Sequence, residues 1–116
     1  MGEAKRNSIA IKDSLMYSQI REMMELQEAL EVRIGGPDWR EAGHSYALCI
    51  HMECAEIIDH IGWKHWKAYG EPDYNAIAME IVDVWHFVLA YCITKGLKAE
   101  AICTFLGRSI KAAEGK

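Results

Sequence analysis

The sequence is most apolar over Ile77-Ala-Met-Glu-Ile-Val-Asp-Val-Trp-His-Phe-Val-Leu-Ala90, and this stretch decides the fold. Wound as a helix, it carries apolar side chains almost all the way round, which is typical of a helix buried on most sides. Asp73 can cap its start, and Gly96 marks its end. Because the chain has only 116 residues, we expect a second copy to cover part of this helix, and the sequence therefore predicts a homodimer.

Three further segments have the apolar spacing of amphipathic helices. They cover residues 14–34, about 44–61 and 97 to about 112, and Gly35-Gly36-Pro37 ends the first of them. No stretch alternates with period two, so the sequence predicts no strands. Four helices with short connections predict an all-α fold, specifically an antiparallel four-helix bundle. Residues 13–116 would form this single domain, preceded by a flexible tail over residues 1–12.

Composition narrows the class of protein. The chain is 51% hydrophobic, enough for one core, and its net charge of -4 argues against a nucleic-acid polymer as partner. The longest uncharged apolar run is far shorter than the roughly 20 residues that span a bilayer, so we expect no membrane partner. The four cysteines show no C-x-x-C spacing. Free thiols in a reducing, cytoplasmic compartment are therefore expected.

Two short carboxylate pairs lie inside apolar stretches, Glu53-x-x-Glu56 and Glu80-x-x-Asp83. Helical residues three apart lie on one face, so each pair projects its two carboxylates side by side. Carboxylates among core residues are costly unless a positive charge meets them. Four of them converging from two helices predict a metal site. The alternative is that both pairs are solvated edges of amphipathic helices.

The ligand type indicates which metal. Carboxylate oxygens suit hard cations, namely Mg²⁺ and secondarily Mn²⁺. Mg²⁺ usually completes its shell with water and substrate phosphates, so the site points to a phosphorylated substrate. A di-iron bundle is a rival interpretation, with Asp83-x-x-His86 and Glu41-x-x-His44 as its nearest motifs. It leaves Glu53 and Glu56 without a role, and we rank it lower.

Other polar side chains are candidates for binding the rest of a substrate. Lys64 and Lys67 follow the first carboxylate pair and suit phosphate oxygens, and Trp63 beside them can stack on a base. An ordinary surface loop explains these three residues equally well. The amide of Gln27 can read a pyrimidine edge, although an exposed glutamine on a polar helix face is the simpler interpretation.

Several stretches resemble the dimeric, all-α dUTP nucleotidohydrolases, within the all-α NTP pyrophosphatases that include the MazG-type enzymes. The resemblance covers roughly residues 15–95 and is carried by Leu26-Gln-Glu-Ala-Leu-Glu31, Asp38-Trp39, Met52-Glu-Cys-Ala-Glu-Ile-Ile-Asp-His-Ile-Gly-Trp-Lys-His-Trp-Lys67 and Glu80-Ile-Val-Asp-Val-Trp-His-Phe87. It implies cleavage of dUTP, and often dUDP, to dUMP by metal-assisted attack of water.

The resemblance also implies roles for individual residues. Mg²⁺ would be bound by Glu53, Glu56, Glu80 and Asp83. Substrate would be bound by Gln27 at the uracil, by Trp39 or Trp63 at the pocket wall, by Lys64 and Lys67 at the phosphates, and by Phe87 at the deoxyribose. Glu53 and Glu56 are the expected catalytic residues, and Glu53 is expected to accept the proton of the attacking water.

The sequence departs from this family at Glu31, where an Asn is usual, and at His65, where a Trp is common. The enzymes it resembles also carry a later segment with further phosphate-binding groups, which residues 97–116 do not match. These departures leave two alternatives open. One is the same chemistry on another nucleotide such as dCTP, and the other is a catalytically silent helical module that binds nucleotide or only dimerises.

Overall fold

The computed structural model describes residues 14–115, and in this part of the chain every regular element is a helix. In chain order the elements are α2 (Leu15–Gly35), the short 3-10 helix η1 (Trp39–Ala42), α3 (Tyr46–Ile61), α4 (Tyr74–Thr94) and α5 (Ala99–Glu114). The predicted all-α fold with four long helices is therefore confirmed. The tail expected over residues 1–12 lies outside the described residues.

Side-chain caps set where the helices begin. The hydroxyl oxygen of Ser14 accepts the backbone N–H of Tyr17 at 3.1 Å, and Asp73 accepts that of Ala76 at the same distance. Ser45 caps α3, which therefore begins two residues after the predicted start. Gly62 ends α3 with φ 91°, in the left-handed region, and a Cβ there would lie 2.6 Å from the Tyr69 ring.

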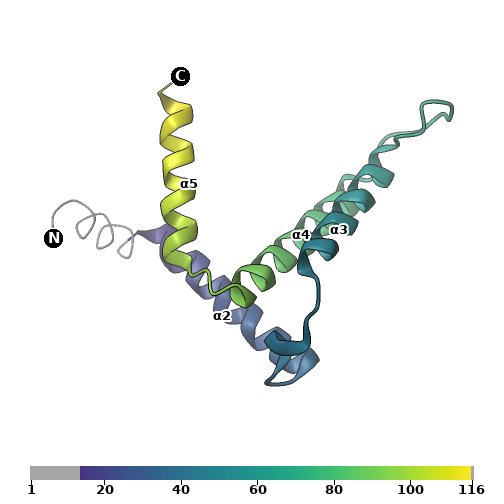
Figure 1. Ribbon diagram of the computed structural model, residues 1–116. Helices are drawn as coiled ribbons and strands as arrows, with labels where there is room; N and C mark the ends of the chain where they lie inside the picture. The colour runs from purple at the N-terminus through teal and green to yellow at the C-terminus, as the bar shows by residue number, and fades with distance from the viewer. Residues whose placement is uncertain (1–13, 116) are drawn as a thin grey trace, which may run out of the picture.

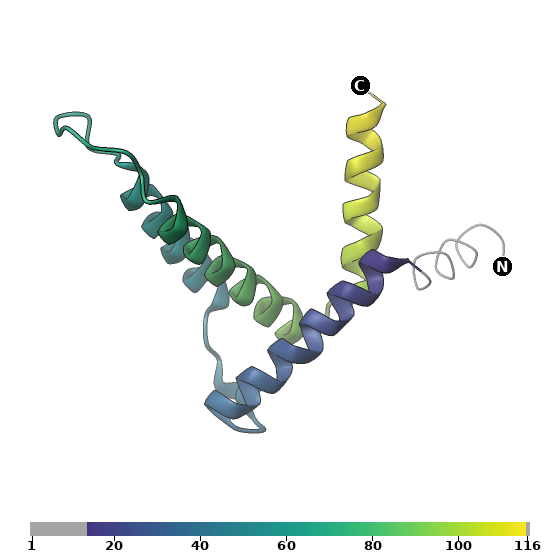
Figure 2. The same cartoon turned by 180° about the vertical axis from the view of Figure 1, so that it is seen from behind.

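The helices form an open arrangement (Figures 1 and 2). α3 and α4 pack side by side as an antiparallel hairpin, with the loop between them at the far tip. α2 packs across the base of this hairpin and also against α5, which points away from the hairpin. The radius of gyration is 17.8 Å, whereas a compact domain of this length has about 13 Å. The bundle helices therefore pack pairwise but are splayed apart in the single chain.

Two small cores hold the helices together. The first contains Trp39, Tyr46, Ala90 and Ile93 and joins η1, α3 and the end of α4. The second joins the start of α2 to α5 through Ile20, Ala99 and Cys103. Only the C-terminal part of α4 contributes buried residues. Met79 and Ile81, nearer its start, remain 61% and 55% exposed, so the expectation of a helix buried on most sides is not met within one chain.

Within residues 14–115, α4 is also the one helix long and apolar enough to cross a membrane, judged by length and composition alone. The core helix of a water-soluble protein meets the same criterion, and α4 packs along α3 and α2. It also carries Glu80 and Asp83 in its middle turns, where a lipid-facing charge is costly.

Candidate metal centre and base-recognition site

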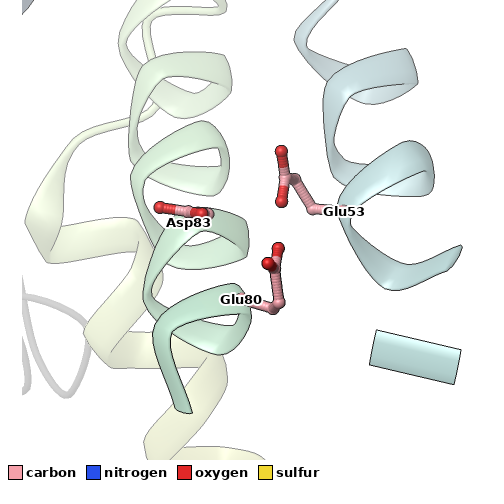
Figure 3. A group of neighbouring side chains, drawn as sticks. All are labelled: Glu53, Glu80 and Asp83. Atoms are coloured by element: carbon pink, nitrogen blue, oxygen red, sulfur yellow. The ribbon is translucent and has the colours of Figure 1, made fainter. Parts of the chain in front are cut away.

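Three of the predicted metal ligands converge between α3 and α4 (Figure 3). Glu53 projects from α3 toward Glu80 and Asp83 on α4. One carboxylate oxygen from each residue lies within 4.8 Å of those from the other two, and all three side chains are half-buried. The two carboxylate pairs therefore face one another, and the alternative of separate solvated edges does not describe these three residues.

The cluster contains carboxylate oxygens that lack partners. One oxygen of Glu53 and one of Glu80 are buried, and neither has a hydrogen-bond partner among the described residues. Leaving such an oxygen unsatisfied is costly. A hard divalent cation accepts carboxylate oxygens at a little over 2 Å, so two ligands of one ion lie about 3–4 Å apart. The donor set and its spacing fit Mg²⁺ or Mn²⁺.

Glu56 and His60 border this cluster. Glu56 is exposed and is not one of the three converging groups. Its pKa is raised, chiefly by a hydrogen bond with Glu80. On the same helix, Nε2 of His60 lies 3.6 Å from the other oxygen of Glu80. The structure thus brings three of the four predicted ligands together, whereas Glu56 is exposed and lies outside this cluster.

The carboxyl groups share protons because they are so close. The hydrogen bond to Glu80 and, secondarily, burial raise the pKa of Glu53 from 4.5 to about 7. The pKa of Glu80 is lowered, because Glu53 and Glu56 donate hydrogen bonds to it. Near neutral pH, Glu53 therefore holds a proton part of the time, and a cation entering the cluster has to displace it.

Gln27 is buried rather than exposed, and it belongs to a hydrogen-bond network between three helices. Only 3% of its surface is accessible. Its Nε2 donates to Oε1 of Glu31 at 2.9 Å, and its Oε1 lies 2.6 Å from Nδ1 of His86 on α4. The hydroxyl of Tyr46 on α3 donates to the second oxygen of Glu31 at 3.2 Å. The simpler interpretation from the sequence, an exposed glutamine, is wrong.

This network lies close to the carboxylate cluster along α4. His86 follows Asp83 by three residues, which is roughly one helical turn, or about 4.5 Å along the axis. A ligand that contacts Gln27 can therefore extend toward the carboxylates. His86, the α4 partner of Gln27, and Asp83 of the carboxylate cluster thus lie on successive turns of α4.

The predicted aromatic walls lie at different places. Trp39 is 2% exposed and packs edge-on against Tyr46, with ring centroids 6.2 Å apart. Phe87 is half-buried, with its ring 6.3 Å from that of Tyr46. Trp63 lies at the opposite end of α3, is 54% exposed, and donates its N–H to Asp59 at 2.8 Å. Within one chain, Trp39 and Phe87 therefore lie beside Tyr46, which belongs to the Gln27 network, whereas Trp63 lies at the other end of α3.

Lys64 and Lys67 lie in the loop at the tip of the α3–α4 hairpin. Nζ of Lys64 lies over the Trp63 ring, 5.6 Å from its centroid, and Lys67 is exposed. Within the described part of the chain, neither lysine forms an ion pair with the carboxylate cluster. The structure places both beyond the C-terminal end of α3, on the side of the cluster away from Gln27.

Sequence reasoning did not assign Glu31 and Tyr46 to the site. The spacing of Gln27 and Glu31, four residues apart on a helix, was the one local signal of their contact. A separate cavity of about 490 Å³ lies between α2 and the α4–α5 connection, lined in part by Arg21, Glu28 and Lys98. It includes none of the residues of the carboxylate cluster or the Gln27 network.

Comparison with known proteins identifies the family. A family model described as dUTPase matches residues 19–113, which include the whole of α3 and α4 and most of α2 and α5. Neither the curated proteins nor the solved structures gave a match. The matched region contains every residue of the carboxylate cluster and of the Gln27 network. The chain belongs to the all-α dUTPase family.

Proposed function

We propose that this protein hydrolyses dUTP, and also dUDP, to dUMP with Mg²⁺ bound by Glu53, Glu56, Glu80 and Asp83. Family membership supports a nucleotide hydrolase. The observation that carries the metal assignment is the pair of buried oxygens, one on Glu53 and one on Glu80, that have no hydrogen-bond partner in residues 14–115. A divalent cation satisfies both at once.

Glu53 would both contribute to the metal site and accept a proton, whereas Glu80 and Asp83 would only hold the metal. Mg²⁺ supplies neutralisation of the phosphate oxygens and activation of a water molecule. Glu53 faces the space where that water would sit, and its raised pKa suits a group that takes up a proton near neutral pH. Glu80 and Asp83, on the facing helix, supply the negative charge that holds the cation.

The substrate would lie along α4, with its base at Gln27 and its phosphates at the carboxylates. Trp39 and Phe87, both next to Tyr46, are the aromatic groups nearest to the base. Lys64 and Lys67 would meet the phosphates on the far side of the cluster, because the loop that carries them directly follows α3.

We also propose that the active form is a homodimer. The splayed arrangement leaves large apolar side chains on the surface of α4, including Met79, Ile81 and Val82. A monomeric domain rarely leaves a contiguous patch of this kind uncovered. A second copy that packs along α4 would bury these side chains and close the open arrangement.

Pyrophosphate release from dUTP, dCTP, dTTP and dATP, measured with Mg²⁺ and with EDTA, tests the function. We expect release from dUTP with Mg²⁺ only, and a loss of at least about 100-fold in Asp83→Asn, since the carboxylate is a metal ligand. Asp38→Asn is the matched control, because Asp38 makes no side-chain capping bond. A folded protein that releases pyrophosphate from none of the four would exclude the proposal.

A second candidate is the same reaction on dCTP. The observation that favours it is the position of Glu31, whose carboxylate accepts hydrogen bonds from Gln27 and Tyr46. A carboxylate there could also accept a hydrogen bond from the amino group of cytosine. The same panel separates the two substrates by their relative rates. Metal-dependent binding of a non-hydrolysable dUTP analogue without turnover of any substrate would instead favour a silent nucleotide-binding module.

A further inference from the structure

We infer that Tyr69 and Asp59 are positioning residues that hold Lys64 in place for the substrate phosphates. The inference rests on the proposed function, because it assigns how the loop at the tip of the α3–α4 hairpin (Figure 1) presents its cation to the same site. Tyr69 acts on the backbone of Lys64. Asp59 acts on the ammonium group of the same lysine through the ring of Trp63.

Side chains set the shape of this loop, which joins the end of α3 to the start of α4. Within residues 63–72, all of which the structure describes, the one backbone hydrogen bond runs from the N–H of Lys67 to the carbonyl oxygen of Lys64 at 3.0 Å. A segment with so few backbone hydrogen bonds samples many conformations unless side chains restrict it. The contacts of Tyr69 and Trp63 supply this restriction.

Tyr69 joins the end of α3 to Lys64. Its ring packs directly on Gly62, where a Cβ would lie 2.6 Å from the nearest ring atom. Its hydroxyl oxygen accepts the backbone N–H of Lys64 at 3.2 Å. The ring is therefore seated at the point where the helix ends, and the hydroxyl fixes the backbone of Lys64 two residues further along the chain.

The ammonium group of Lys64 is held by Trp63. Its Nζ lies 5.6 Å from the centroid of the Trp63 ring, within the range of a cation–π contact. The indole N–H donates to Oδ1 of Asp59 at 2.8 Å, four residues earlier on α3. Trp66 packs edge-on against the same indole, with ring centroids 5.9 Å apart. The ring under the ammonium group is thus fixed to the helix.

Lys64 is therefore restricted at both ends, whereas the side chain of Lys67 is exposed and makes no contact of this kind in the described part of the chain. A free lysine loses rotamer entropy when it binds a phosphate, and a restricted lysine loses less. A cation–π contact at an exposed ring is weak, so Nζ can leave the ring for a phosphate oxygen at little cost. Lys64 is thus the better prepared of the two lysines.

A double-mutant cycle in kcat/KM for dUTP, measured with Mg²⁺, tests the inference. Tyr69→Phe keeps the ring on Gly62 and removes only the oxygen that accepts the Lys64 N–H. We expect kcat/KM to fall about threefold to tenfold, the effect of losing one hydrogen bond. In the Lys64→Ala background, the same change should alter kcat/KM by less than about twofold, because the lysine through which Tyr69 acts is absent.

Tyr74→Phe is the matched control for this cycle. Tyr74 begins α4, is 67% exposed, and its hydroxyl makes no hydrogen bond in the described chain. Its kcat/KM should equal that of the wild type. An equal loss from Tyr69→Phe in both backgrounds would overturn the inference, since a purely structural effect does not depend on Lys64. A wild-type kcat/KM in Tyr69→Phe would overturn it as well.

Asp59→Ala tests the other end of Lys64, and it replaces Tyr69→Phe if that variant does not fold. It removes the acceptor of the Trp63 N–H, and its effect should also vanish in the Lys64→Ala background. Asp59→Asn should restore most of the lost kcat/KM, because its side-chain oxygen accepts the same hydrogen bond. An Asp59→Asn variant as impaired as Asp59→Ala would overturn the assignment of Asp59.

The proposed function and this inference fail differently. A wild-type kcat/KM in Lys64→Ala would overturn the inference and leave the reaction itself intact. If the wild type prefers dCTP, the same cycle is measured with dCTP. If it turns over neither nucleotide, calorimetry with a non-hydrolysable dUTP analogue gives the cycle from affinities. The same non-additivity would then support the inference without catalysis, and an analogue that does not bind would overturn both.

Discussion

Glu53 on α3 and Glu80 on α4 face one another across the space between the helices, with carboxylate oxygens within 4.8 Å and one buried oxygen on each that lacks a partner. Like charges at this separation repel. Without a cation, and above the pKa of Glu53 at about 7, the pair therefore destabilises the packing of α3 on α4, the most extensive helix pair of the fold. With a cation, the same two groups hold the helices together.

Removal of one charge should stabilise the metal-free protein. In Glu53→Gln at pH 8 with EDTA, we expect the thermal midpoint to rise by about 4 °C, the shift that about 1 kcal/mol produces in a domain of this size. The further rise on addition of Mg²⁺ should disappear, because the variant lacks a ligand. Differential scanning fluorimetry measures both effects. A midpoint below that of the wild type in EDTA would show that the pair is not repulsive.

The raised pKa of Glu53 gives the metal-free protein a defined pH dependence. Its folded value is about 7, against 4.5 as the ordinary value. Protonation therefore favours the folded state, fully below about pH 4.5, and this stabilisation is lost as the pH rises toward 7. The lowered pKa of Glu80 has the opposite effect on stability. It stabilises the folded state above the ordinary pKa, and this stabilisation is lost only as the pH falls below that value. Thermal midpoints in EDTA should fall between pH 5 and pH 7.5.

The affinity of the protein for Mg²⁺ should change with pH in the opposite direction. Because the cation has to displace the proton on Glu53, its affinity should rise with pH up to about 7 and then level off. Calorimetric titration of Mg²⁺ at pH 5.5, 6.5, 7.5 and 8.5 measures this dependence. Glu53→Gln provides the control, because it lacks this ligand and its Mg²⁺ binding should be lost at every pH. An affinity that does not change with pH would mean that the cation binds away from Glu53.

The dimer proposal predicts that a charge on the exposed face of α4 separates the subunits. Ile81→Asp should convert a species of twice the 13.2 kDa chain mass into a monomer, measured by sedimentation equilibrium. Ile81 is 55% exposed in the single chain, so in a protein that is already monomeric the change should alter stability by less than about 0.5 kcal/mol. Wild-type protein that sediments as a monomer would contradict the proposal.

Trp39 anchors η1 to the end of α4, and its removal should be costly. Trp39→Ala empties a position that is 2% exposed, and we expect a loss of about 3–5 kcal/mol in the free energy of unfolding. Trp39→Phe keeps part of the volume and should lose much less. Urea unfolding at a fixed protein concentration measures both. Similar losses in the two variants would indicate that the indole does not fill the core as described.

Local patterns predicted the helices and the convergence of carboxylates between α3 and α4 well, because their signals are local. Ser14 and Asp73 are good capping residues, and Gly62 and Gly96 can take the positive φ at which a helix ends. The carboxylate cluster was predictable because its members lie three residues apart on faces flanked by apolar residues. The predicted start of α3 at about His44 was two residues too early, because Ser45 is the residue that caps the helix.

Tertiary features were harder to predict. Gln27 is buried because α4 brings His86, 59 residues later in the chain, against it, and no local pattern records that contact. Trp39 and Trp63 were equivalent candidates from the sequence, and only the course of α3 places them at opposite ends. The splay of the helices depends on apolar surfaces of α4 that find no partner within the described chain.

The most direct measurement of the central claim is the position of a bound cation. Crystals grown with Mn²⁺, which takes the same oxygen ligands as Mg²⁺, reveal the ion in an anomalous difference map. We expect peaks only between α3 and α4, bounded by carboxylate oxygens of Glu53, Glu56, Glu80 and Asp83. Mn²⁺ bound elsewhere on the protein, with these four carboxylates free of metal, would contradict the account.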